Sequence, residues 1–235
     1  MCGRYFRKSD KQRIAEAFHL EVFENLPLEV APSYNIAPTT MQPVIRNNRD
    51  TGEREMVAMR WGMVPHFAKS LADFKGFSTI NAKAETLLSK PLWRVPFHRR
   101  RCLIPADGFY EWKRLDEKTK QPYAIAMKDQ SLFAFAGLWD RWRAQRPDEE
   151  DVQSCTIVTS RANEFLAPIH SRMPIVLSEA RAAAWLASEP LVPAGKRTRA
   201  SARWPLSTSV NRSRISLLGS PMATVRVTSV VPSRY

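Results

Sequence analysis

A cysteine follows the initiator methionine, so removal of Met1 would leave a chain that begins with Cys2. Such a residue carries an α-amine and a thiol on neighbouring carbons. The reference pKa of an α-amine is about 7.7–8.0, against about 10.4 for lysine, so far more of it is unprotonated near neutral pH. The amine can attack an aldehyde to give an imine, and the thiol can then close a thiazolidine ring in an intramolecular step. Taken alone, Cys2 could equally be a small residue with no chemical role.

Standard catalytic and metal-binding motifs are absent from the rest of the chain. The sequence contains no GxGxxG, phosphate-binding loop, HExxH or GxSxG motif. Its three cysteines lack the paired spacing of a zinc site, and its four histidines do not cluster. Cys102 and Cys155 lie in apolar runs and are predicted to be core thiols. We therefore expect no metal ion and no organic cofactor.

Ionisable and amide residues instead lie in short segments interrupted by proline or glycine, namely MCGRY, SYNIAP, RWGMVP, INAKAE, PADGFYEW and PIHSRMP. Loops of this kind commonly carry function. Each residue also has a simpler explanation when taken alone. Asn81 could cap a helix that starts near Ala82. Glu111, close to Lys113, could be a solvated charge, and His170 could be a loop histidine bonded to backbone.

Taken together and in this order, the segments resemble the SRAP family (SOS response-associated peptidase domain), whose members protect abasic sites in single-stranded DNA by covalent crosslinking. The resemblance extends from Cys2 to about Asn211 and implies the fold of that family. The matching motifs are Cys2-Gly3-Arg4, Tyr34-Asn35-Ile36-Ala37-Pro38, Trp61-Gly62, Asn81-Ala82 with Glu85, Cys102-Leu103-Ile104-Pro105-Ala106, Gly108-Phe109-Tyr110-Glu111-Trp112 and His170-Ser171-Arg172-Met173-Pro174.

The resemblance implies a role for each of four residues. Cys2, after removal of Met1, resembles the nucleophile that forms a Schiff base and then a thiazolidine with the ring-opened sugar. Asn81 resembles the residue that orients the N-terminal group and the sugar. Glu111 and His170 resemble two acid/base groups, which imine formation needs because protons must move in both directions. Partial desolvation of Glu111 between two aromatic residues favours a raised pKa and an acid role.

The resemblance also implies contacts with DNA around this site. The residues concerned are Arg4, Asn35, Lys83, Thr159 and Arg172, with Phe67 in the 61–67 loop as an aromatic wedge against stacked bases. Basic side chains would make binding salt-sensitive and largely independent of sequence. Lys83 stands where the family commonly has Arg, so it keeps the charge without the planar guanidinium.

Two other functions remain as alternatives. The family name suggests a cysteine peptidase, acting on itself or a peptide, with Cys2 as nucleophile and His170 as base. A non-covalent module that coats single strands would use the net charge alone. The leading hypothesis is a DNA-damage protein that links Cys2 to the aldehyde of an abasic site and so shields the strand. We expect it to act as a monomer on single-stranded DNA, with an association with replication forks.

The charge balance supports a polyanionic partner. Thirty-six Lys and Arg against 23 Asp and Glu leave a net charge of +13, which is typical of proteins that contact nucleic acid. Basic residues cluster at 94–101, 141–146 and 196–214. The chain has no apolar run long enough for a membrane span and no N-terminal signal-peptide pattern. The sparse cysteines fit a reducing compartment, so we expect a cytoplasmic protein, nucleoid-associated if bacterial.

The elements that must position these residues form an α+β pattern. We expect helices over 10–19, 82–88 and 178–186, an ordered loop over 27–43, and a hairpin of strands 43–46 and 56–62 joined by a turn at 47–52. Further strands are expected at 102–104, 123–128, 132–138 and 155–159. We expect one domain over 1–235, with a C-terminal strand and tail from about 212 to 235. Many short strands with few helices predict a twisted, barrel-like, mainly antiparallel sheet.

Overall fold

The computed structural model describes residues 2–20, 29–71, 74, 79–187 and 225–229. Its strands, in chain order, are β1 (Arg4–Arg7), β2 (Ser33–Ile36), β3 (Met41–Asn47), β4 (Arg54–Trp61), β5 (Asn81–Lys83), β6 (Arg101–Ala106), β7 (Gly108–Arg114), β8 (Lys120–Met127), β9 (Phe133–Trp142), β10 (Val152–Arg161), β11 (Arg172–Pro174), β12 (Val176–Leu177) and β13 (Val225–Ser229). The helices are α1 (Lys11–Phe18), α2 (Pro91–Arg99) and α3 (Glu179–Leu186), with one 3-10 turn, η2 (Ala84–Thr86). None of the helices in these ranges is long and apolar enough to cross a membrane.

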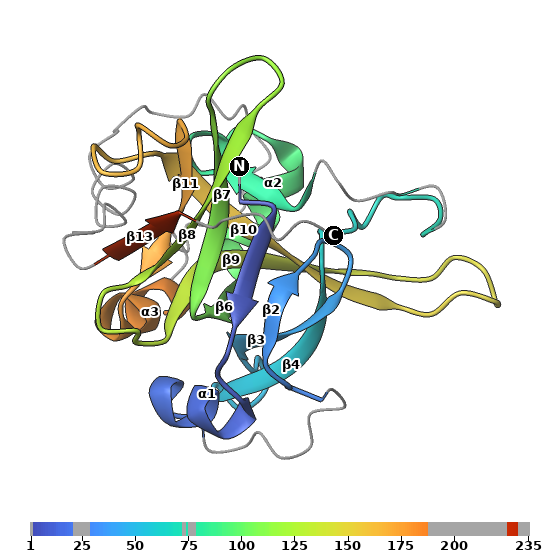
Figure 1. Ribbon diagram of the computed structural model, residues 1–235. Helices are drawn as coiled ribbons and strands as arrows, with labels where there is room; N and C mark the ends of the chain where they lie inside the picture. The colour runs from blue at the N-terminus through green and yellow to red at the C-terminus, as the bar shows by residue number, and fades with distance from the viewer. Residues whose placement is uncertain (1, 21–28, 72–73, 75–78, 188–224, 230–235) are drawn as a thin grey trace, which may run out of the picture.

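Five strands close into a barrel in the order β10, β4, β3, β6, β9 and back to β10 (Figure 1). β4 and β10 run parallel, and the other four pairings are antiparallel. β6 is buried along its whole length, and β9 is buried except at Arg141, because these strands are covered on both faces. The predicted α+β domain with a barrel-like, mainly antiparallel sheet is confirmed.

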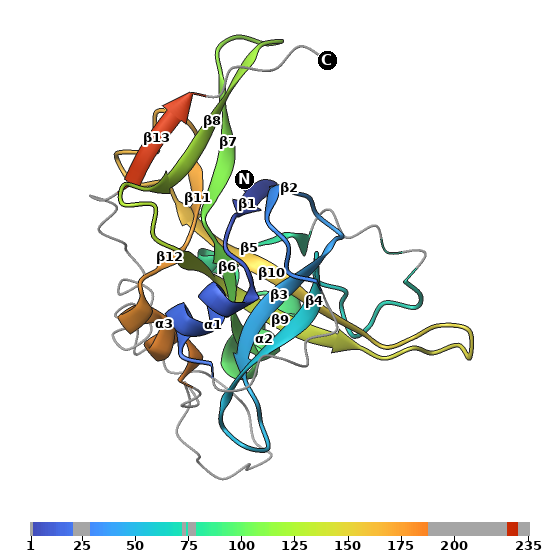
Figure 2. The ribbon, with the colours of Figure 1, turned by 60° about the horizontal axis from the view of Figure 1, so that its bottom comes forward.

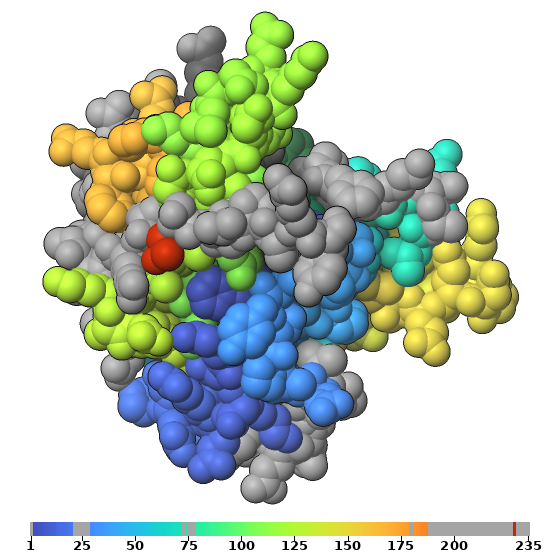
Figure 3. Space-filling view, viewed as in Figure 1, coloured from blue at the N-terminus to red at the C-terminus, as the bar shows by residue number. Residues whose placement is uncertain are grey.

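A second sheet has the strand order β13, β8, β7, β1, β2 and carries the start of the chain. On the face in Figure 3, the N-terminal segment and β2 lie side by side. β1 lies against β7, with Tyr5 opposite Phe109. The ring of Tyr5 also makes edge contacts with Trp61 and Phe135 of the barrel, at centroid distances of 5.2 and 5.7 Å. These contacts tie the N-terminal strand to the barrel interior.

Gly108 permits the close approach of β1 to β7. A Cβ atom at this position would lie 2.1 Å from Cζ of Phe6 and 2.7 Å from the carbonyl oxygen of Ile125. No other residue type fits at such distances without displacing a strand. Beside it, the Asp107 carboxylate accepts hydrogen bonds from the backbone N–H groups of Lys8 and Ser9, at 2.6 and 2.9 Å. Together these residues fix the end of β1, where the chain leaves the strand.

The helices pack their apolar faces against the barrel. Ile14 of α1, Trp93 of α2 and Trp185 of α3 belong to one buried cluster with Leu103 and Leu138 of the barrel strands. A second buried cluster fills the barrel interior and includes Cys2, Met59, Trp61, Cys102, Phe135, Cys155 and Ile157. The prediction that Cys102 and Cys155 are core thiols is confirmed, since both are fully buried and free.

Several predicted elements are confirmed with small changes. The helix over 10–19 is α1, but Asp10 caps it by accepting the Arg13 N–H at 2.8 Å, while Ser9 bonds Asp107. The 43–62 hairpin is β3 paired with β4, and the four further strands predicted after it are β6, β8, β9 and β10. The last helix is α3, and part of the predicted C-terminal strand is β13. The rest of the tail lies outside the described residues.

Two predicted elements are wrong. The segment predicted to be a loop contains β2, and β3 begins at Met41, because pairing with β1 and β4 imposes extended structure on a proline-containing stretch. The helix predicted over 82–88 is instead β5 followed by η2. Parallel pairing of β5 with β10 overrides the local helix propensity. Pro91, expected to end that helix, begins α2, where its missing N–H leaves no hydrogen bond unmade.

Candidate active site

Cys2 is fully buried at the point where the chain enters β1. Its thiol donates weakly to the Arg4 carbonyl oxygen, with a sulfur–oxygen distance of 3.8 Å. Burial raises the pKa of the Cys2 thiol well above its ordinary value, and the nearby Glu111 carboxylate raises it further. The thiol is therefore held in its neutral, protonated form.

Asn81 holds the backbone of Cys2. Its side-chain amide donates to the Cys2 carbonyl oxygen at 2.9 Å, and the pair is buried. Asn81 begins β5, opposite Ile157 of β10, so it does not cap a helix. In the described part of the chain, Oδ1 of Asn81 is buried and accepts no hydrogen bond. This atom can accept one from a bound molecule.

Glu111 lies in β7 with only 3% of its surface exposed, which excludes the alternative that it is a solvated charge. Burial raises the pKa of its carboxyl above the usual range, and the positive charge of a protonated His170 opposes this shift. The raised pKa of Glu111 has the direction predicted from its position between Tyr110 and Trp112. Since Glu111 interacts electrostatically with both Cys2 and His170, these three side chains form one electrostatic group.

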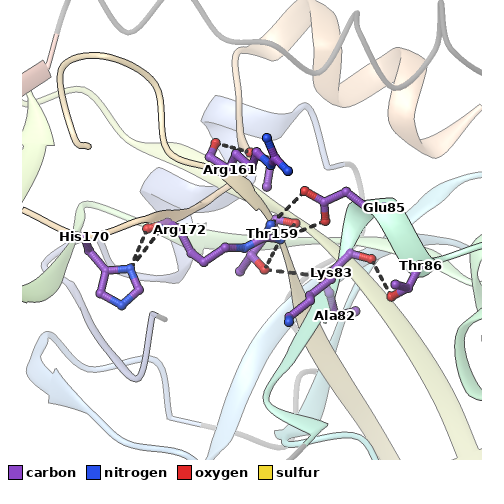
Figure 4. Close-up of polar contacts among 9 residues, drawn as sticks. Ala82, Lys83, Glu85, Thr86, Thr159, Arg161, His170 and Arg172 are labelled. Carbon is purple, nitrogen blue, oxygen red and sulfur yellow. Dashed lines mark hydrogen bonds and ion pairs between the residues drawn. The ribbon is translucent and has the colours of Figure 1, made fainter.

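His170 precedes β11 and is bonded to backbone, as its simpler explanation expects. Its Nδ1 accepts the Arg172 N–H at 2.9 Å and lies 3.1 Å from the Arg172 carbonyl oxygen (Figure 4). In a neutral imidazole, accepting this bond at Nδ1 places the ring proton on Nε2. In that tautomer His170 presents Nε2–H as a donor.

Arg172 is held by two neighbours. Its guanidinium forms a two-pronged ion pair with Glu85, at 2.7 and 3.0 Å, and also donates to the backbone and hydroxyl oxygens of Thr159, at 2.8 and 3.2 Å (Figure 4). Hydrogen bonds from Arg172 hold the pKa of Glu85 below its usual value. Glu85 was part of a recognised motif, but the sequence did not indicate its pairing with Arg172, because the partners are far apart in the chain.

The residues predicted to contact DNA differ in how exposed they are. Thr159 is fully buried, so it is a positioning residue for Arg172 and does not present a surface to DNA in this conformation. Lys83 is exposed and lies opposite Thr159 across β5 and β10. Arg4 is half-buried and donates to the Gly3 carbonyl oxygen at 3.0 Å, and Asn35 is exposed on β2.

Phe67 is exposed in a segment that contacts β9. Its side chain is 62% exposed and contacts His66, whose Nδ1 is 3.5 Å from a carboxylate oxygen of Asp140 in β9. The next residue, Ala68, accepts a hydrogen bond from the indole N–H of Trp142 at 2.7 Å. These contacts hold the segment around Phe67 against β9.

In the ranges that the structure describes, no group of three or more His, Cys, Asp or Glu side chains is arranged so that it could hold a metal ion. The fold and the site together define a barrel protein with a candidate active site built around the start of its chain. The description "SOS response associated peptidase (SRAP)" belongs to the family that matches residues 1–213. The chain belongs to this family, which confirms the resemblance noted from its motifs.

Two of the proteins similar to this chain are named abasic site processing proteins. Abasic site processing protein YoqW of Bacillus subtilis (strain 168) is 43% identical over 187 residues, which cover 79% of this chain and 80% of that protein. Abasic site processing protein HMCES of Mus musculus is 33% identical over 194 residues, covering 68% of this chain and 54% of that protein. A crystal structure from Bacteroides thetaiotaomicron has the same fold, with a TM-score of 0.76, 22% identity, and coverage of 98% of this chain and 92% of that one.

Proposed function

We propose that this protein processes abasic sites in single-stranded DNA by linking them covalently to Cys2 after removal of Met1. The observation that carries the proposal is that Asn81 binds the Cys2 backbone, Glu111 interacts with Cys2, and His170 interacts with Glu111, from four separate segments of the chain. Relatives named abasic site processing proteins supply the substrate class. The product is a thiazolidine, which leaves no carbonyl to drive strand cleavage.

The first bond would form between the α-amine of Cys2 and C1′ of the ring-opened sugar. His170 donates from Nε2–H to the sugar ring oxygen, which favours the open aldehyde. The amine adds to the carbonyl carbon and gives a carbinolamine. Protonated Glu111 then delivers a proton to the leaving hydroxyl, and water departs to leave an iminium ion. The iminium returns its N–H proton to the Glu111 carboxylate and becomes the imine. A carboxyl with a raised pKa suits this acid step near neutral pH.

The second bond closes the ring. The Cys2 sulfur adds to the imine carbon, and the thiol proton passes to the imine nitrogen. One aldehyde and one aminothiol thus give one thiazolidine and one water. Asn81 holds the Cys2 carbonyl oxygen during both steps, so the amine and thiol keep a fixed orientation.

The state of the thiol argues against the peptidase alternative. A cysteine peptidase needs a thiolate, which a neighbouring cation commonly stabilises. Here burial and the Glu111 carboxylate raise the pKa of Cys2 by more than the charged N-terminal amine lowers it, which disfavours the thiolate. A neutral thiol is compatible with ring closure, because it supplies the proton that the imine nitrogen accepts.

A denaturing gel tests the proposal. Protein whose mass shows that Met1 is removed would be incubated with a single-stranded oligonucleotide containing one abasic site. We expect a shifted band that survives SDS and heat without borohydride, and that is absent with an intact-thymine oligonucleotide or with Cys2→Ala. Cys2→Ser should also abolish the stable adduct while retaining DNA binding. An undiminished band from Cys2→Ser would overturn the proposal.

A further inference from the structure

A second basic surface lies at the far end of the barrel from Cys2. It is formed by arginines from three segments that surround Trp139: the end of β3 and its turn, the α2–β6 junction, and β9. We define the arginine surface as Arg46, Arg49, Arg99, Arg100, Arg141 and Arg143. Two of the basic clusters noted in the sequence, 94–101 and 141–146, meet here through the fold.

The arginine surface is hollowed. Two adjoining cavities of about 450 and about 390 Å³ share Asn47, Asn48, Arg49 and Trp139 in their walls. The guanidinium of Arg46 stacks over the Trp139 ring at 4.3 Å from its centroid, while those of Arg49 and Arg100 lie at 5.8 Å. Stacking holds these guanidinium planes in place at the wall of the groove.

Carboxylates neutralise only part of this charge. Glu55 pairs with Arg46 at 2.7 Å, Asp140 pairs with Arg100, and Asp151 pairs with Arg141 at 2.6 Å. Arg49 donates to the backbone carbonyl of Arg99 at 3.2 Å.

Two exposed arginines therefore remain available. Within the described ranges, neither Arg49 nor Arg143 pairs with a carboxylate. Burial, followed by the charges of Arg100, Arg46 and Arg99, lowers the pKa of Arg49, and the carboxylate of Asp140 offsets only part of this effect. An anion that enters this groove would relieve the repulsion.

The arginine surface is separate from the candidate active site. Gln153, which accepts from Arg46 at 2.8 Å, and Thr159, which holds Arg172, lie in the same strand. At about 3.3 Å per residue along a strand, they are about 20 Å apart. Figure 2 places the β3–β4 turn at the bottom of the molecule, whereas the start of β1 and the β7–β8 hairpin lie at the top.

We propose that the arginine surface binds the sugar-phosphate backbone of DNA, independently of the crosslinking site. Arginine forks match phosphate geometry, and a groove with several of them follows a chain of phosphates better than a single anion. Among the described residues that line the groove, the large aromatic ring is that of Trp139, which Arg46 covers, so the contact is made to the backbone and not to the bases. This surface would let the protein hold a strand near damage without reacting with it.

Binding of undamaged DNA tests this proposal. The affinity for an oligonucleotide, as a single strand and as a duplex of the same sequence, would be measured by fluorescence anisotropy at several salt concentrations. For Arg49→Glu/Arg143→Glu we expect weaker binding and a shallower plot of log affinity against log salt, by about 0.7 per lost phosphate contact for single strands or about 0.9 for duplex. The arm with the larger loss identifies the form of DNA bound.

Two further variants control for charge and folding. Arg13→Glu/Lys128→Glu makes the same change in net charge at exposed positions on α1 and after β8. DNA binding by this control should depend more steeply on salt concentration than binding by Arg49→Glu/Arg143→Glu does. Arg49→Lys/Arg143→Lys keeps the charge and should retain most of the salt dependence. Equal binding by Arg49→Glu/Arg143→Glu and its matched control would overturn the proposal.

Adduct formation with a short abasic oligonucleotide separates the two sites. We expect the Arg49→Glu/Arg143→Glu protein to form the adduct at the wild-type rate. If the rate of adduct formation by this variant falls as much as its affinity for undamaged DNA, the arginine surface belongs to the crosslinking site. That result would overturn the proposal that the surface acts independently. If wild-type protein forms no adduct but the surface variant still loses DNA binding, the crosslinking proposal fails and this one stands.

Discussion

The side-chain amide of Asn81 donates a 2.9 Å hydrogen bond to the carbonyl oxygen of Cys2, joining two segments that are 79 residues apart. Because the pair is buried, Asn81→Ala leaves a buried carbonyl without its donor, at a cost of about 1–3 kcal/mol. At about 1.4 kcal/mol for each tenfold, we expect the crosslinking rate to fall about 5- to 150-fold. Single-turnover adduct formation on denaturing gels measures it.

The matched control for Asn81→Ala is Asn47→Ala. Asn47 also donates from a side-chain amide to a backbone carbonyl, that of Leu186, at 3.2 Å, but at the far end of β3. Both variants should lose stability to urea, and only Asn81→Ala should lose crosslinking. Equal rates in the two variants would reduce Asn81 to a structural role.

Glu111 makes crosslinking depend on pH. Burial raises the pKa of its carboxyl, so the protonated acid persists to a higher pH than an exposed glutamate allows. The crosslinking rate should fall as pH rises through that raised pKa. Glu111→Gln should be slower by about 10²–10⁴-fold and should lose this dependence. A wild-type pH–rate profile that is flat between about pH 5 and 8 would contradict the acid role.

The same raised pKa affects stability. The unfolded chain ionises Glu111 at a lower pH than the folded protein does, so Glu111 costs stability once the pH passes its ordinary pKa. The loss is complete above the raised pKa. Glu111→Gln should therefore increase the melting temperature near neutral pH, and the difference should shrink as the pH falls below the ordinary pKa of a glutamate. Melting curves across this range check the sign.

The Glu85–Arg172 ion pair sets how strongly Arg172 can attract phosphate. Since Glu85 is 46% exposed, its loss should cost no more than about 1 kcal/mol of stability. Glu85→Gln should tighten binding of single-stranded abasic DNA a few-fold, because Arg172 loses its counter-charge, whereas Arg172→Ala should weaken it. Glu16→Gln on α1 is the charge-matched control. Weaker binding by Glu85→Gln would mean that the pair must stay intact to position Arg172.

Gly108 tests the packing that places Cys2. Gly108→Ala puts a methyl group into Phe6, and overpacking of this kind costs about 1–3 kcal/mol. Gly52→Ala is the control, because its Cβ meets nothing within 4 Å and only its φ of +79° is unfavourable. In urea unfolding, Phe6→Leu should partly rescue Gly108→Ala, since it shortens the clashing side chain, and should not rescue Gly52→Ala.

The sequence by itself determined the elements whose signals are local. The α1 and α3 helices, the β3–β4 hairpin and the later barrel strands follow from apolar spacing, turn residues and caps. It also predicted which residues belong to the candidate site, because the motifs around Cys2, Asn81, Glu111 and His170 occur in the family's order. These signals depend on neighbours within a few residues, which a single chain displays directly.

Only the tertiary structure decided where these residues lie. Asn81 begins a strand because β10 pairs with it, so pairing across the fold overrode its local pattern. Thr159 is buried and accepts a hydrogen bond from Arg172, and His66, the neighbour of Phe67, lies 3.5 Å from Asp140 of β9. The arginine surface likewise formed from three separate segments. Contacts between distant segments depend on strand register and barrel closure, which local sequence does not encode.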